Sequence, residues 1–177
     1  MENSGNRTKE REDRKMIKNN PSVVGDKRID DLRAAFAHRG AWFYYLYKAG
    51  KAHGLDEQFA REAIFEAGAD YTYKKYRPTD DIRIFAEDFV NPNVKLIFEM
   101  EPTVTDECMD VRFHYCPLVD AWQKMGIPED EIEKLCDIAM CGDRGLTSMF
   151  PEFEMVLDGT IAEGKDNCHL IIRKKQK

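Results

Sequence analysis

The spacing of apolar residues changes along this chain, and that change most constrains its fold. From residue 30 to residue 89 the apolar side chains recur at helical spacing, in three segments, the second of which ends by Pro78. Residues 94–100 and 108–116 then alternate apolar and polar side chains, which is typical of strands. The first half therefore predicts three helices followed by an antiparallel pair of strands.

The second half repeats this order. Pro117 suits the first position of a helix that ends at Gly126, and Pro128 begins another helix that Gly142 is expected to end. Alternation returns at residues 153–157 and 168–172. The order predicts an α+β fold, with N-terminal helices packed on a roughly four-stranded antiparallel sheet and two further helices inserted between the strand pairs.

The length of 177 residues suits one domain, which we place at residues 28–177. Residues 1–27 are polar, lack periodicity and carry Asn20-Pro21 and Gly25. Such a segment cannot bury much apolar surface, so we expect a disordered or loosely attached N-terminal arm.

Charge and cysteine content limit the classes of partner. The net charge is −6 and both ends are basic, so the body is more acidic still, which argues against nucleic acid. No apolar run reaches the length of a membrane span, and the N-terminus lacks the apolar segment of a secretory signal. Five cysteines, an odd number in a chain long enough to do without disulfides, indicate free thiols and a cytoplasmic location.

Cys116 is the first candidate for chemistry, because it lies where a strand should end and a helix begin. As the residue before Pro117 it would occupy the N-cap, where free N–H groups and partial positive charge lower the pKa of a thiol. Strand parity places His114 on the same face, as a possible base for a Cys116 nucleophile. Asp110 and Arg112 share that face, and the alternative is a strand face turned to solvent.

A second group of candidates lies further along. Asp143 stands between two glycines after a predicted helix and could orient an acid or hold a substrate amino group; turn chemistry is the alternative. Cys136 and Cys168 fall on apolar faces, where core packing is the ordinary role. Paired C-x-x-C spacings are absent, although His114 and three of the thiols could still converge on zinc.

The run from Trp42 to Tyr47 is almost wholly aromatic. Its side chains would cover all sides of a helix, which predicts burial, with one edge, including Trp42 and Tyr45, able to line a pocket.

Several strings together resemble the L-2-amino-thiazoline-4-carboxylic acid hydrolase family. The resemblance covers roughly residues 30–173 and is most specific around Cys116. The strings that carry it are His114-Tyr115-Cys116-Pro117-Leu118-Val119-Asp120-Ala121-Trp122, Leu135-Cys136-Asp137-Ile138-Ala139, Gly142-Asp143-Arg144-Gly145, Thr160-Ile161-Ala162-Glu163-Gly164 and Asn167-Cys168-His169-Leu170, with weaker echoes in His38-Arg39-Gly40-Ala41-Trp42 and Arg61-Glu62-Ala63-Ile64-Phe65-Glu66-Ala67-Gly68.

The resemblance implies a small-molecule hydrolase that opens a cyclic amidine or amide at a carbon–nitrogen bond. We expect Cys116, His114 and Asp143 to be catalytic. The residues expected to bind the substrate are Arg112, Cys136, Cys168, Trp42 and Tyr45. We expect no cofactor and no metal; the alternatives are hydrolysis that uses bound zinc or manganese, and a ligand-binding or sensor domain without catalysis. A homo-oligomer is among the expected states.

Overall fold

A computed structural model describes residues 16–176 of the chain. Short 3-10 and π segments connect or extend several of its helices. In chain order the elements are α2 (Lys27–Ala52), α3 (Gln58–Glu66), η1 (Ala67–Thr72), η2 (Tyr73–Lys75), α4 (Ile82–Phe89), α5 (Pro92–Ile97), β1 (Met100–Val104), β2 (Cys108–Phe113), α6 (Pro117–Lys124), α7 (Glu129–Ala139), α8 (Cys141–Ser148), β3 (Phe153–Leu157), η3 (Ile161–Glu163) and β4 (Cys168–Lys174).

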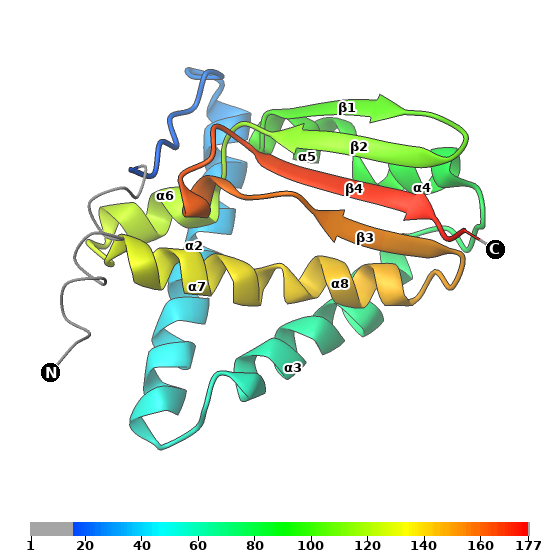
Figure 1. Cartoon of the computed structure of the whole chain (residues 1–177). Helices are drawn as coiled ribbons and strands as arrows, with labels where there is room; N and C mark the ends of the chain where they lie inside the picture. The colour runs from blue at the N-terminus through cyan, green and yellow to red at the C-terminus, as the bar shows by residue number, and fades with distance from the viewer. Residues whose placement is uncertain (1–15, 177) are drawn as a thin grey trace, which may run out of the picture.

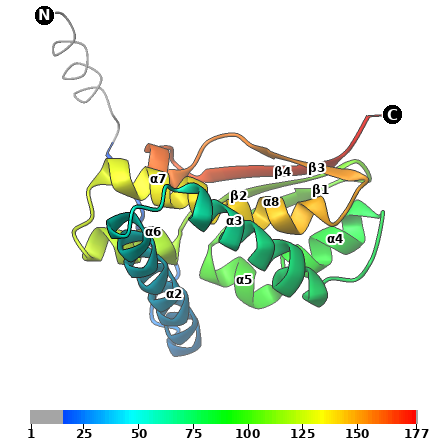
Figure 2. The ribbon, with the colours of Figure 1, turned by 90° about the horizontal axis from the view of Figure 1, so that it is seen from below.

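The four strands form one antiparallel sheet in the order β1-β2-β4-β3 (Figure 1). Turned on its edge in Figure 2, the sheet has α3, α4, α5 and α8 on one side. The strands alternate accordingly: Met109 and Val111 of β2 and Leu170 and Ile172 of β4 are fully buried toward the helices. The predicted α+β class and antiparallel sheet are confirmed.

Several helices begin where a side chain caps the helix or a proline occupies its first position. The Asp26 carboxylate accepts hydrogen bonds from the first backbone N–H groups of α2, and Asp81 caps α4 in the same way. Pro117 is the first residue of α6, as predicted, and Gly126 follows that helix with a positive φ of 71°.

The strand predicted for residues 94–100 is wrong. Residues 92–97 form α5, because Asn91 accepts a hydrogen bond from the Val94 N–H and Pro92 is preset for the first helical position. The first strand instead begins at Met100 and runs through Pro102. β1 is an edge strand, where a residue without an N–H can be tolerated.

The helical region between the strand pairs is also longer than predicted. Gly142 does not end it, since α8 follows α7 after one residue and gives three helices there instead of two. Gly145 and Gly68 allow α8 to approach α3 and η1 closely: a Cβ on Gly145 would lie 2.0 Å from the Phe65 carbonyl oxygen, and one on Gly68 would lie 1.9 Å from that of Gly142. These glycines therefore serve helix packing and not turns.

Part of the predicted loose arm is anchored. Residues 1–15 lie outside the described part of the chain, but Ile17 is buried in the core beside α6 and α7 and its N–H donates to Glu129. Further along, the Ser22 and Val23 N–H groups donate to the Glu99 carboxylate, which also pairs with Arg33 at 2.8 Å. Residues 16–26 are thus held to the domain by named contacts.

Within residues 16–176, none of the helices combines the length and the apolar character that a membrane crossing requires.

Candidate functional site

Cys116 lies between β2 and α6, at the N-cap position that the sequence predicts. The buried Asn19 amide holds its peptide unit, accepting from the Cys116 N–H at 2.8 Å and donating to its carbonyl oxygen at 2.9 Å. Trp122, on the same helix, is buried and donates to the Gly40 carbonyl oxygen of α2 at 3.0 Å. The position of the thiol is therefore fixed by α2, α6 and the anchored arm.

The expected low pKa of Cys116 is not what the environment gives. Burial raises the pKa of this thiol, whereas the Val119 and Leu118 backbone N–H groups and the Arg39 guanidinium act in the lowering direction. Loss of hydration outweighs the helix N-terminus, so the resting group is the thiol. The Cys116 side chain makes no capping hydrogen bond in this state, so these N–H groups act on the sulfur without forming a cap to it.

Arg39 of α2 lies within electrostatic reach of both the Cys116 thiol and the Asp143 carboxyl group. Asp143 is in the first turn of α8, and burial raises its pKa to about 6, although Arg39 and Arg144 act against this rise. Arg39 of α2 lies over the Phe36 ring at 4.6 Å, and its pKa is lowered by burial against the attraction of Asp143 and Cys116. By surface area Arg39 is exposed, and Cys116 and Asp143 are partly so. Each residue therefore has some surface in contact with water, although the Cys116 thiol and the Asp143 carboxyl group themselves lie in a largely desolvated environment.

Cys136 and Cys168 lie beside Cys116. The β2–β4 register pairs Cys168 with Phe113, three residues before Cys116, and the Ile161 N–H donates to the Cys168 sulfur at 3.2 Å. Burial raises the pKa of Cys168 to about 12 and raises that of Cys136 well above its ordinary value, and the thiols strengthen each other's shifts. Cys136 and Cys168 also pack in the core cluster that contains Trp122, and Cys116 packs against the same cluster. The two thiols are therefore both core residues and neighbours of Cys116.

His114 and Arg112 do not join this cluster. β2 ends at Phe113, so strand parity no longer governs His114, whose Nε2 lies 3.0 Å from Glu101 Oε2 on β1. Arg112 pairs with Asp110 at 3.2 Å on the sheet face away from the helices. Within residues 16–176, His114 therefore pairs with Glu101 and forms no hydrogen bond with Cys116.

The aromatic helix is only partly buried. Tyr47 is 5% exposed, but Trp42 and Tyr45 are 63% and 62% exposed. They lie on the outer side of α2, and the prediction that they line a pocket is not supported by this placement.

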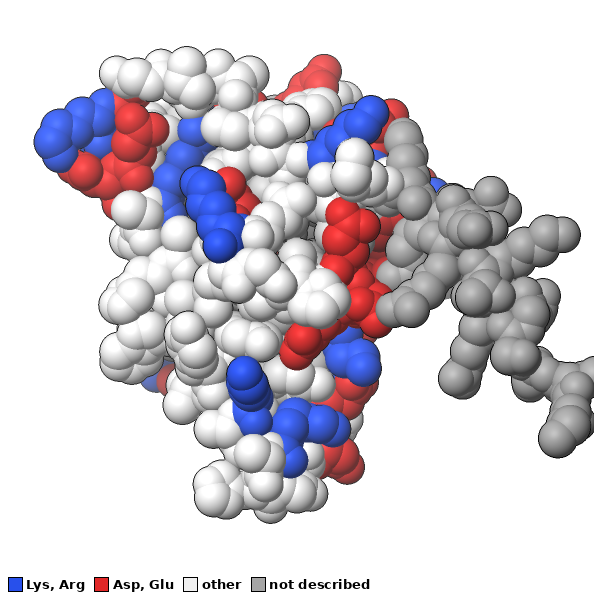
Figure 3. All heavy atoms as spheres, turned by 90° about the vertical axis from the view of Figure 1, so that its left-hand side faces the viewer, with Lys and Arg blue, Asp and Glu red and all other residues white. Residues whose placement is uncertain are grey.

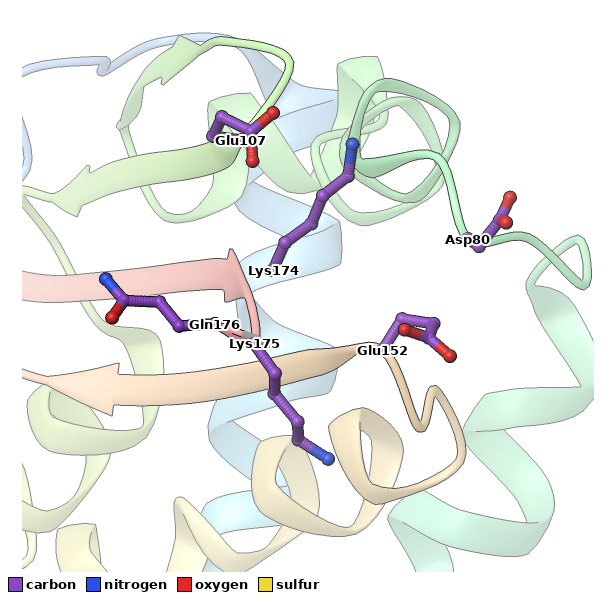
Figure 4. Close-up of a pocket in the computed structure, with 6 residues that line it drawn as sticks. All are labelled: Asp80, Glu107, Glu152, Lys174, Lys175 and Gln176. Carbon is purple, nitrogen blue, oxygen red and sulfur yellow. The ribbon is translucent and has the colours of Figure 1, made fainter.

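Two surface hollows in the described part of the chain lie elsewhere. One is formed at the ends of β3 and β4 by six side chains without a thiol or imidazole, as Figure 4 shows: Asp80, Glu107, Glu152, Lys174, Lys175 and Gln176. Another borders α7 and includes Arg61, Asp137 and Thr160. In residues 16–176, His, Cys, Asp and Glu side chains do not gather in a group of three suited to a metal ion.

Sequence reasoning missed Arg39 and Asn19. A signal for Arg39 existed, because it is the one charged residue between Arg33 and Lys48 in an otherwise apolar and aromatic helix. Asn19 gave no such signal, since it falls in a polar segment without periodicity.

The model of one protein family, described as L-2-amino-thiazoline-4-carboxylic acid hydrolase, matches residues 33–172. That range includes Arg39, Cys116, Cys136, Asp143 and Cys168. No curated protein matches the chain.

A solved structure shares the fold. It is subunit 3 of a trafficking protein particle complex from Naegleria fowleri, covalently bound to palmitic acid; 13% of residues are identical, the TM-score is 0.54, and the match covers 81% of this chain and 97% of that chain. At this identity the likeness concerns the fold alone.

Proposed function

Because the chain belongs to the L-2-amino-thiazoline-4-carboxylic acid hydrolase family, we propose that it hydrolyses a carbon–nitrogen bond of a small cyclic amidine or amide. The observation that supports this most is that the Arg39 guanidinium lies within electrostatic reach of both the Cys116 thiol and the Asp143 carboxyl group, in residues that are not fully buried.

Cys116 is the proposed nucleophile and Asp143 the proposed proton carrier. As the sulfur attacks the amidine or amide carbon, the thiol proton passes to the Asp143 carboxylate, and the carbon–sulfur bond forms. Asp143 then gives this proton to the leaving nitrogen as the carbon–nitrogen bond breaks. Water then attacks the carbon of the resulting thioester or thioimidate, its hydroxyl stays on that carbon, the carbon–sulfur bond breaks, and its other proton passes to the leaving Cys116 thiolate.

The N-terminus of α6 supports charge in this reaction. The Leu118 and Val119 N–H groups already act on the Cys116 sulfur, and donors placed in this way stabilise anionic charge as it develops. Arg39 is the proposed anchor for a substrate carboxylate, because its guanidinium can form paired hydrogen bonds with such a group. The proposed reaction needs no cofactor; zinc or manganese found in stoichiometric amount, with loss of activity to chelators, would favour the metal-dependent alternative.

The direct test is incubation of the purified protein with L-2-amino-thiazoline-4-carboxylic acid and with related cyclic amidines and amides. Ring opening followed by mass spectrometry, with a trapped acyl or amidino adduct on Cys116, is the expected result. A protein that opens none of these rings at any pH between about 5 and 9 would sink the proposal.

A second candidate is a ligand-binding domain without turnover. The raised pKa values of the three neighbouring thiols favour it, since such groups are mostly protonated and slow to react at neutral pH. The solved relative by fold, which holds a fatty acid covalently, gives a form that such binding could take. Ligand-dependent melting without product, or a stable acyl adduct, would distinguish this candidate.

Replacing Asp143 by asparagine is expected to lower kcat/KM by about 10²-fold or more, because the proton carrier is lost. In the wild type, kcat/KM should rise with pH through about 6, where Asp143 ionises, and the variant should lose this limb. Rates measured from about pH 5 to pH 8 check both expectations.

The same variant is expected to be more stable than the wild type at neutral pH. A carboxyl group whose pKa is raised on folding stabilises the fold below its ordinary pKa, and this contribution disappears as pH rises through about 6. Removing it should therefore add about 1–3 kcal/mol at pH 8 and little below pH 3.8, the ordinary pKa of the group. Asp137→Asn is the matched control with the opposite sign, since Arg61 and Arg144 pair with Asp137 and its pKa is lowered. A wild-type rate without a limb near pH 6, or a destabilised Asp143→Asn, would contradict the assignment.

A further inference from the structure

The outer face of α2 carries apolar side chains where a solvent-facing helix normally carries charge. Trp42, Tyr45 and Leu46 are 63%, 62% and 65% exposed. Figure 3, which views the side on which α2, α6 and α7 lie, shows a continuous uncharged area between separate groups of charged side chains. We call the set Ala35, His38, Trp42, Tyr45, Ala49 and Ala52, all of them exposed, the α2 outer face.

These residues have the spacing of a helix-pairing seam. Ala35, Trp42 and Ala49 are seven residues apart, and His38, Tyr45 and Ala52 repeat the same interval three residues later. The His38 and Trp42 rings meet edge to face at 5.6 Å, so the centre of the seam is an ordered aromatic pair. Aromatic residues in the centre of an exposed apolar patch are typical of protein interfaces.

The face is complementary to itself about Trp42. Ala35 and Ala49 lie seven residues before and after it, and Asp31 and His53 lie eleven residues before and after it. If a second α2 ran in the opposite direction across a two-fold axis at Trp42, small side chains would meet small ones and Asp31 would meet His53. Asp31 pairs with Lys27 on its own helix at 2.6 Å, but its side chain is 66% exposed and an exposed pair of this kind is weak enough to be exchanged. Antiparallel helices also bring opposite ends of their dipoles together. A parallel pair would bring like ends together.

We propose that α2 pairs with α2 of a second copy of this chain, antiparallel and with Trp42 at the two-fold axis. Such a contact uses the same patch on both subunits, which is what the symmetry of the α2 outer face provides. The pairing removes two exposed aromatic side chains per chain from water, which is the main source of its stability.

The test begins with the mass and fluorescence of the full chain in solution. Sedimentation should give twice the 20.6 kDa of one chain at micromolar concentration, with dissociation on dilution. The chain has two tryptophans and Trp122 is 1% exposed, so dilution should shift the emission of Trp42 alone to longer wavelength. Tyr45→Lys should be monomeric, whereas Tyr71→Lys, at a tyrosine 65% exposed on another element, should remain dimeric.

Charge exchange tests the orientation. The chain with Ala35→Glu and Ala49→Glu should be monomeric, because like charges would meet at both ends of the seam. The chain with Ala35→Glu and Ala49→Lys should dimerise again, since each glutamate would face a lysine of the other copy. Monomeric wild-type protein at all concentrations, a dimeric Tyr45→Lys, or failure of the Glu/Lys pair to restore the dimer would overturn the proposal. So would a monomer whose Trp42 emission shifts only when lipid vesicles are added, which would assign the face to a membrane surface.

Discussion

Cys116→Ser is expected to lower kcat for ring opening by about 10³-fold or more while leaving the fold intact. A serine hydroxyl is far less acidic than a thiol, and the Asp143 carboxylate, with a pKa of about 6, is too weak a base to activate it. Because the substituted atom is the attacking one, the loss should appear in kcat and kcat/KM together, with substrate binding retained. Steady-state rates and a ligand-dependent melting curve of the variant check this.

Cys108→Ser is the matched control. Cys108 is a free, partly exposed thiol on the outward face of β2, so its replacement should leave the rate unchanged. A Cys116→Ser protein that keeps wild-type turnover would remove the nucleophile from the mechanism. In that case the roles proposed for Asp143 and Arg39 would have to be assigned to a reaction without a cysteine nucleophile.

The sequence predicted those features that depend on a few neighbouring residues. The start of α6 at Pro117 and the alternation in β2 and β4 are local, and each was predicted. Residues 94–100 were misread because a short alternating run also fits a turn or two of helix, and the Asn91 cap decided between them.

The candidate site was predictable only where it was local. The place of Cys116 between a strand and a helix follows from the residues around it. The sign of its pKa shift does not, because it depends on how much water α2, α7 and β4 exclude from the sulfur. The meeting of Arg39 with Asp143 also depends on tertiary packing, since more than one hundred residues separate them in the sequence.

Packing also reversed the role expected for the glycines around Asp143. They flank it in a pattern that is usual for a turn. In the fold, Gly145 instead lets α8 lie against the Phe65 carbonyl, and this contact places Asp143 in the first turn of a helix beside Arg39. Burying the Asp143 carboxyl group lowers the free energy of unfolding at neutral pH, and such a loss of stability is typical of functional sites.

Glu99→Gln is expected to destabilise the domain by about 3 kcal/mol at pH 7, because it leaves the buried Arg33 guanidinium without its counter-charge. Both side chains of the pair are only 8% exposed. Arg33 also donates to the backbone carbonyls of Val23 and Ile97 and stacks over the Tyr115 ring, so it cannot turn to water without breaking contacts that hold residues 16–26 and the segment before Cys116. Urea unfolding followed by circular dichroism measures the difference.

The pH dependence of this difference identifies its cause. Burial acts to raise the pKa of Glu99, but the hydrogen bonds from Ser22, Val23 and Arg33 outweigh burial, and the pKa is lowered. A carboxyl group with a lowered pKa stabilises the fold above its ordinary value, and this contribution is lost as pH falls through the folded-state pKa. The difference in free energy of unfolding between the wild type and Glu99→Gln should therefore narrow below about pH 4.3.

Glu101→Gln is the control, at a neighbouring carboxylate whose side chain is 72% exposed; it should change the free energy of unfolding by less than about 1 kcal/mol at either pH. A Glu99→Gln protein as stable as the wild type at pH 7 would show that the buried pair does not anchor the arm over Cys116.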